Sequence, residues 1–87
     1  MTTTDILDRL IDPKEGDLSP EAAQSILALQ FSQEDRDRMQ ALARKANEAG
    51  LSAVEEAEAE RYELIGNLLA RLHSKARLSL QQAAERH

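Results

Sequence analysis

The chain has 87 residues, of which 16 are acidic and 11 basic, and it carries a formal net charge of −5 with no cysteine. Because a domain needs roughly 50 to 200 residues to close a core, this length allows one small domain. The absence of cysteine excludes disulfide bonds, thiol chemistry and cysteine-ligated zinc. The acidic balance argues against a general attraction to nucleic acid or to anionic membranes, and it favours a basic partner.

The N-terminal stretch "MTTTDILDRLID" has neither a basic flank nor a continuous apolar run, so it predicts no signal peptide and no spanning helix. We therefore expect a cytoplasmic protein without a membrane partner. An apolar cluster of Ile6, Leu7, Leu10 and Ile11 suits one or two helical turns, and the turn-like "DPKEGD" follows it. The first segment, 1–17, is accordingly predicted to be a short helical or flexible arm.

A single helical domain is predicted over 18–87, because this part is rich in strong helix formers and shows no alternating β pattern. Ser19, Ser32 and Ser52 each precede a predicted start, where a side-chain oxygen caps free backbone N–H groups. Gly50 follows the second helix and offers a left-handed stop. The resulting class is all-α, with helices over about 20–30, 33–49 and 53–85.

The last predicted helix is the longest: at ~1.5 Å per residue it spans about 50 Å, whereas the preceding helix spans about 25 Å. An antiparallel hairpin around Gly50 would bring Leu42 to Tyr62 and Met39 to Ile65. The predicted fold is thus a helical hairpin with a long C-terminal helix and a short N-terminal helical arm. A projection at about 100° per residue places the packing face of the long helix at Val54, Tyr62, Ile65, Leu68, Leu69, Leu72, Ala76, Leu80 and Ala83.

The C-terminal half of the long helix outruns its hairpin partner, so its apolar side needs another cover. One interpretation is coverage within the chain by Ile26, Leu27 and Leu29. The alternatives are a second copy or another protein, whose orientation two basic side chains at the rim would help to set. We call this surface the C-terminal strip, and its predicted partner-binding residues are Leu68, Leu69, Leu72, Lys75, Ala76, Arg77 and Leu80.

Acidic residues crowd the N-terminal half of the long helix. Glu56, Glu60 and Glu63 share one helical face, which is either a solvated surface or a surface that attracts a basic partner or a hard cation. Glu58 and Arg61 project toward the packing face instead, where an ion pair would fix the register more than it would add stability. They are expected to pair with each other or, across the hairpin, with Arg38 or Arg44.

No catalytic, cofactor-binding or metal-binding residues are predicted. His73 and His87 lack a carboxylate or a second histidine at the helical spacing of a metal site. Ser74 adjoins His73, but neighbours on a helix diverge by about 100° and do not form a dyad. The basic side chains near His73 lack a helix-turn-helix context and interleaved aromatics, so direct nucleic-acid binding is not expected.

Two stretches, "LSPEAAQSILALQFSQEDRDRMQALARKANEAGLS" and "ERYELIGNLLARLHSKARLSL", resemble a family of small, mostly uncharacterised bacterial all-helical proteins. The resemblance covers about 18–80. Some members resemble the upstream partner in gene pairs with an HNH-type nuclease, which implies an antitoxin-like or regulatory role. This chain departs at the turn, where "EAGLSAVEEAEAE" replaces Gly-Thr-Leu-Thr-Pro-Glu-Glu. The matching positions are Leu18, Ser19, Pro20, Glu21, Phe31, Ser32, Gly50, Tyr62, Leu68, Leu69, Leu72, Ser74, Lys75, Ala76 and Arg77.

These patterns together predict a non-catalytic protein-protein interaction module without a cofactor. Its partner is an unidentified protein, and a basic nuclease is the partner that the resemblance implies. The alternative is a self-contained structural homodimer, in which two long helices pair antiparallel with the acidic half of one against the basic half of the other.

Overall fold

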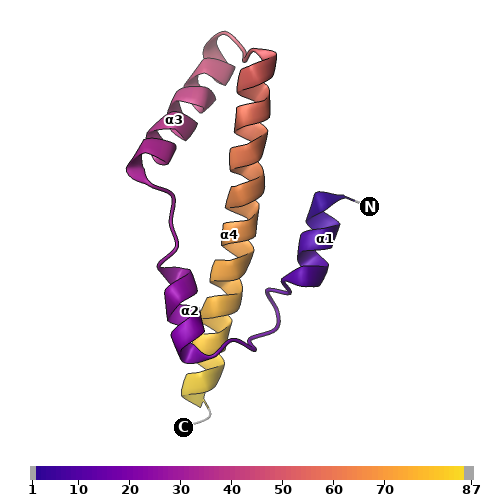
Figure 1. Cartoon of the computed structure of the whole chain (residues 1–87), viewed down its shortest axis with the longest axis vertical. Helices are drawn as coiled ribbons and strands as arrows, with labels where there is room; N and C mark the ends of the chain where they lie inside the picture. The colour runs from indigo at the N-terminus through magenta and orange to yellow at the C-terminus, as the bar shows by residue number, and fades with distance from the viewer. Residues whose placement is uncertain (1, 86–87) are drawn as a thin grey trace. The chain divides into compact units, whose positions relative to one another are not determined.

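The computed structural model describes residues 2–85, which form four α-helices and no strand (Figure 1). The helices are α1 (Thr3–Leu10), α2 (Pro20–Leu27), α3 (Gln33–Glu48) and α4 (Ala53–Glu85). The predicted all-α class, with its long C-terminal helix and short N-terminal elements, is confirmed. None of these helices within 2–85 is long and apolar enough to cross a membrane. The side chain of Leu7 and the whole of His87 lie outside the described residues.

Side-chain caps begin three of the helices at the predicted places. The Ser19 hydroxyl accepts a hydrogen bond from the Ala22 N–H, and the Ser32 hydroxyl accepts one from the Asp35 N–H. Ser52 forms a reciprocal capping box, since its hydroxyl accepts from the Glu55 N–H while its own N–H donates to the Glu55 carboxylate at 2.9 Å. Each cap gives an acceptor to an N–H that has no partner inside the helix.

The helix ends are decided by local backbone geometry. Gly50 has φ 82°, a left-handed conformation that only glycine adopts at little cost, and its N–H donates to the Lys45 carbonyl. Helix α2 ends at Leu27, three residues before the predicted end at 30. The Leu29 N–H donates to the Ile26 carbonyl at 3.0 Å, a tighter turn that closes α2 early.

The chain forms two compact units, and this division does not follow the predicted boundary between 1–17 and 18–87. We call the first the terminal unit, made of residues up to 30 together with 67 onward, and the second the hairpin unit, 31–66. The short N-terminal segment belongs to the terminal unit, where it packs with the C-terminal half of α4.

Within the terminal unit, α2 runs antiparallel along α4. The Leu18 N–H donates to the Ser79 hydroxyl at 3.1 Å, and the Leu29 carbonyl lies 2.9 Å from His73 Nε2. These two hydrogen bonds fasten α2 at both ends. Ala23 and Ala76 have no exposed surface, and such small side chains allow two helices to approach closely.

Within the hairpin unit, α3 packs against the first half of α4 through a thin core. Leu42 is buried, and the Phe31 and Tyr62 rings meet edge to face at a centroid distance of 6.0 Å. The predicted packing face is wrong at two positions, since Val54 is 77% and Ile65 49% exposed. Tyr62 lies on the packing side of α4 as predicted. The observed packing face is therefore turned about the axis of α4 relative to the predicted face, and the two faces still share Tyr62.

Candidate functional site

The C-terminal strip lies in the terminal unit, and its centre is covered there. Ala76 is fully buried, whereas Arg77 is exposed. The four leucines of the strip are half-buried: Leu68, Leu69, Leu72 and Leu80. This arrangement favours coverage within the chain over a strip that is open to a partner.

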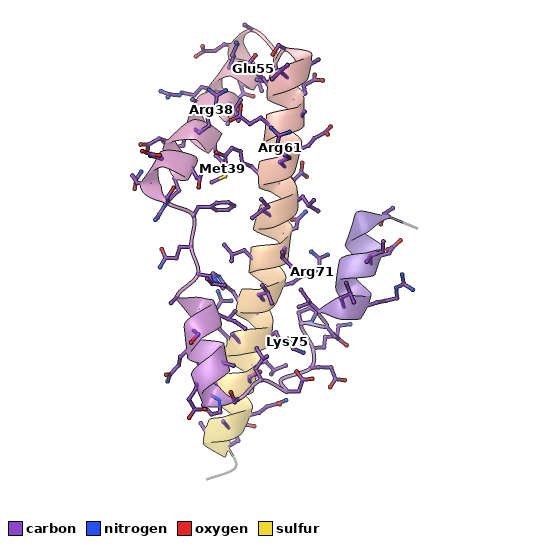
Figure 2. The ribbon with its side chains drawn as sticks, in the orientation of Figure 1. Arg38, Met39, Glu55, Arg61, Arg71 and Lys75 are labelled. Atoms are coloured by element: carbon purple, nitrogen blue, oxygen red, sulfur yellow. The ribbon has the colours of Figure 1, made fainter. Side chains whose placement is uncertain are left out.

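Lys75 binds the N-terminal segment through an ion pair and a hydrogen bond, so it does not form the free basic rim that was predicted. Its Nζ lies 2.6 Å from the Asp17 carboxylate and 2.9 Å from the Glu15 carbonyl, and the side chain is only 13% exposed. Hydrogen bonding to Lys75 lowers the pKa of the Asp17 carboxyl. Arg71, labelled in Figure 2, also binds the N-terminal segment, since its Nε donates to the Asp8 carboxylate at 2.8 Å.

Ser79 is a further attachment point that the sequence analysis missed. Its hydroxyl is buried, donates to the Lys75 carbonyl at 2.8 Å and accepts from the Leu18 N–H. Gly16 lies so close to this part of α4 that a Cβ there would be 3.0 Å from the Leu78 side chain. The signal available in the sequence was a serine three residues after Ala76, on the same helical face.

One flank of the hairpin unit is closed by polar links. The Arg38 guanidinium donates to both oxygens of the Glu58 carboxylate, as one of the predicted alternatives required. Further along, Lys45 Nζ lies 2.7 Å from the Glu55 carboxylate, a second ion pair between α3 and α4. The last link is one hydrogen bond, in which the Tyr62 hydroxyl donates to the Asp35 carboxylate at 2.8 Å and fixes the end of the hairpin away from the turn.

These links change the acidity of the groups involved. The hydrogen bond from Lys45, with further hydrogen bonds from Ser52, lowers the pKa of Glu55 to about 2. The Arg38 guanidinium likewise lowers the pKa of Glu58, and a hydrogen bond to the Asp35 carboxylate raises the pKa of the Tyr62 hydroxyl. On the closed flank, the Glu55 and Glu58 carboxylates are therefore neutralised by Lys45 and Arg38.

The opposite flank is an open apolar groove with a volume of about 280 Å³. In Figure 2, Arg38 and Met39 both project from α3 of the hairpin; Arg38 belongs to the closed flank and Met39 lines the groove. The groove exists because alanines stand where larger side chains would close the gap between the helices. We call it the hairpin groove, and its lining residues are Met39, Leu42, Ala43, Ala46, Leu51, Ala59, Tyr62 and Glu63.

Acidic side chains follow the α4 edge of the hairpin groove. Glu63 lines it, and helical spacing of three and four residues places Glu60 and Glu56 on the same face. Across residues 2–85 these exposed glutamates take part in none of the ion pairs. On the α3 edge, the same spacing places the exposed side chains of Arg36, Gln40 and Asn47 beside Ala43, so this edge carries one basic group where the α4 edge carries three acidic ones.

A second hollow of about 240 Å³ is lined by Glu58, Arg61, Tyr62 and Ile65. Its acidic group, Glu58, is already paired with Arg38. No cluster of three or more His, Asp or Glu among the described residues is arranged to hold a metal ion. Comparisons of the chain with protein-family models, with curated proteins and with solved structures gave no match.

Proposed function

We propose that this chain is a non-catalytic protein-protein interaction module whose docking surface is the hairpin groove. The observation that supports the proposal is the asymmetry of the hairpin unit. One flank is closed by Arg38–Glu58, Lys45–Glu55 and Asp35–Tyr62, whereas the other leaves apolar side chains from both helices open. Two packed helices with one uncovered seam bury more apolar surface when a third element fills that seam.

This proposal moves the docking surface away from the C-terminal strip. A partner that bound Leu72 and Ala76 would have to displace α2 and break the contacts of Lys75 and Ser79. The hairpin groove needs no such rearrangement. An antitoxin-like or regulatory role beside a basic nuclease, which the sequence resemblance implies, is one specific form of the same function.

Site-directed photo-crosslinking tests the proposal. A photoreactive phenylalanine analogue at Ala43 lies in the groove, and the same analogue at Ala57 is a matched control on the far side of α4. Both positions are exposed and helical. In native cell extract we expect a discrete adduct with another protein from the Ala43 variant and none from the Ala57 variant.

The outcomes separate the two candidate functions. An adduct of twice the chain mass from Ala43 would support the structural homodimer instead, and sedimentation at several concentrations would show that dimer directly. Equal labelling from Ala43 and Ala57, or no protein adduct from either, would refute docking at the hairpin groove.

A further inference from the structure

We infer that the occupant of the hairpin groove is a single amphipathic helix of a partner protein, with lysine or arginine beside its apolar stripe. This inference rests on the proposed function and specifies the chemistry of its partner. It depends on three features of the hairpin unit, namely the shape of the groove, the charge of its rim and the charges already neutralised elsewhere.

The shape favours a helix. The groove lies between two antiparallel helices and runs along α3 from Met39 to Ala46, which is about 10 Å at ~1.5 Å per residue. That length matches two turns, so anchor side chains spaced three or four residues apart would fill it. Ala43, Ala46 and Ala59 leave room for a third helix to approach, as in a three-helix bundle.

The rim favours a basic helix. Glu56, Glu60 and Glu63 recur at i, i+4 and i+7, so they follow the α4 edge of the groove over two helical turns. A docked helix would place one of its own flanks along this row. Lysine or arginine there would neutralise the row, whereas glutamate or aspartate would face like charges at short range.

The charges elsewhere in the hairpin sharpen this contrast. Two other glutamates of α4, Glu55 and Glu58, face α3, where Lys45 and Arg38 neutralise them. On the part of α4 that belongs to the hairpin unit, the acidic groups without an ion pair are therefore Glu56, Glu60 and Glu63. The Coulomb attraction that they offer acts on the association rate and on orientation as well as on affinity.

A second copy of the chain suits the groove less well. Two copies would bring a net charge of −5 each to an already acidic rim. On the most basic stretch of α4, Arg71 and Lys75 are already paired with Asp8 and Asp17. The charge pattern thus points to a different protein.

Designed peptides test the inference on the full-length protein. The first peptide is about three heptads long, with leucine at positions a and d and lysine along one flank. The second carries glutamate in place of those lysines, and a scrambled version of the first controls for charge alone. Fluorescence anisotropy near 0.1 M ionic strength, where the Debye length is about 10 Å, measures Kd for each peptide.

We expect the lysine-flanked peptide to bind and the glutamate-flanked and scrambled peptides to bind at least about tenfold more weakly. Changing Glu56, Glu60 and Glu63 together to glutamine should raise the Kd of the first peptide by about tenfold. The matched control changes exposed glutamates away from the groove and alters net charge equally: Glu21→Gln, Glu34→Gln and Glu48→Gln. It should leave Kd nearly unchanged. Ala43→Arg, which fills the groove while preserving helix propensity, should abolish binding.

Three results would overturn the inference. The first is equal binding of the lysine-flanked and glutamate-flanked peptides, and the second is an equal loss of binding from the two triple variants. The third is unchanged binding after Ala43→Arg in a variant whose circular dichroism matches the parent. Crosslinking of a partner at Ala43 alongside any of these results would leave the proposed function standing and reject the basic helix. Loss of the Ala43-specific adduct would reject the docking function itself.

Discussion

Arg38 and Glu58 lie 20 residues apart in sequence, yet the Arg38 guanidinium donates to both carboxylate oxygens at 2.9 and 2.7 Å. This bidentate pair joins α3 to α4 and sets the register of the hairpin. The Arg38 side chain is 44% exposed, so water screens the attraction and the pair contributes more to geometry than to stability. The same register places Met39 and Ala43 along the open groove.

A double-mutant cycle tests that role. Arg38→Gln and Glu58→Gln should each lower Tm by a few degrees, and the double variant should lose less than the sum of the two. The measurement is thermal unfolding followed by circular dichroism at low and high salt. Arg44→Gln paired with Glu58→Gln is the matched control and should show additive effects. Strict additivity for Arg38 and Glu58 would contradict the pair.

Acid should weaken the hairpin in a defined pH range. The pKa of Glu55 falls from an ordinary value of 4.5 to about 2 in the folded chain, so the unfolded chain binds the proton more readily. The stabilising contribution is therefore fully present above about pH 4.5 and is lost as the pH falls toward about 2. The lowered pKa of Glu58 acts in the same direction.

Urea unfolding at a series of pH values between 7 and 2 measures this effect. Glu55→Gln should be less stable than the parent at neutral pH, and the difference should shrink through the acidic range. Glu60→Gln is the control, since Glu60 makes no ion pair within residues 2–85. A constant difference between Glu55→Gln and the parent at every pH would be incompatible with the Lys45–Glu55 link.

Substitution of alanine for Gly50 and for Gly66 should change the free energy of unfolding in opposite directions. Gly50→Ala should destabilise the chain by about 1 to 2 kcal/mol, because φ 82° is strained for any residue with a Cβ. Gly66 lies inside α4, and a Cβ there would meet only Phe31 at an ordinary contact distance of 4.0 Å. Gly66→Ala should therefore stabilise by about 0.5 to 1 kcal/mol through helix propensity. Denaturant unfolding measures both, and the same sign for the two variants would contradict this account.

Removal of the Ser79 hydroxyl should loosen the N-terminal segment. Ser79→Ala leaves the Leu18 N–H without its acceptor, which should cost about 1 to 3 kcal/mol. Hydrogen exchange of the Leu18 amide should become faster while amides of α3 keep their protection. Ser74→Ala is the matched control, because Ser74 is exposed on the same helix. Equal exchange in the two variants would show that Ser79 does not hold this segment.

Local features of the fold were readable from the sequence. Ser19, Ser32 and Ser52 predict helix starts because a cap depends on a side chain and the N–H groups two or three residues away. Gly50 predicts the hairpin turn because its left-handed backbone is a property of the residue itself. The all-α class follows from the same local preferences, summed over the chain.

Tertiary structure alone decided which faces are covered and which stay open. Lys75 and Ser79 look like solvated helix residues until the segment before α2 folds onto them and supplies their partners. Val54 fits the apolar period of α4, yet the rotation that pairs Arg38 with Glu58 and Lys45 with Glu55 turns it outward. Periodicity fixes the spacing along one helix, whereas the angle at which two helices meet is set by long-range contacts that a single sequence does not reveal.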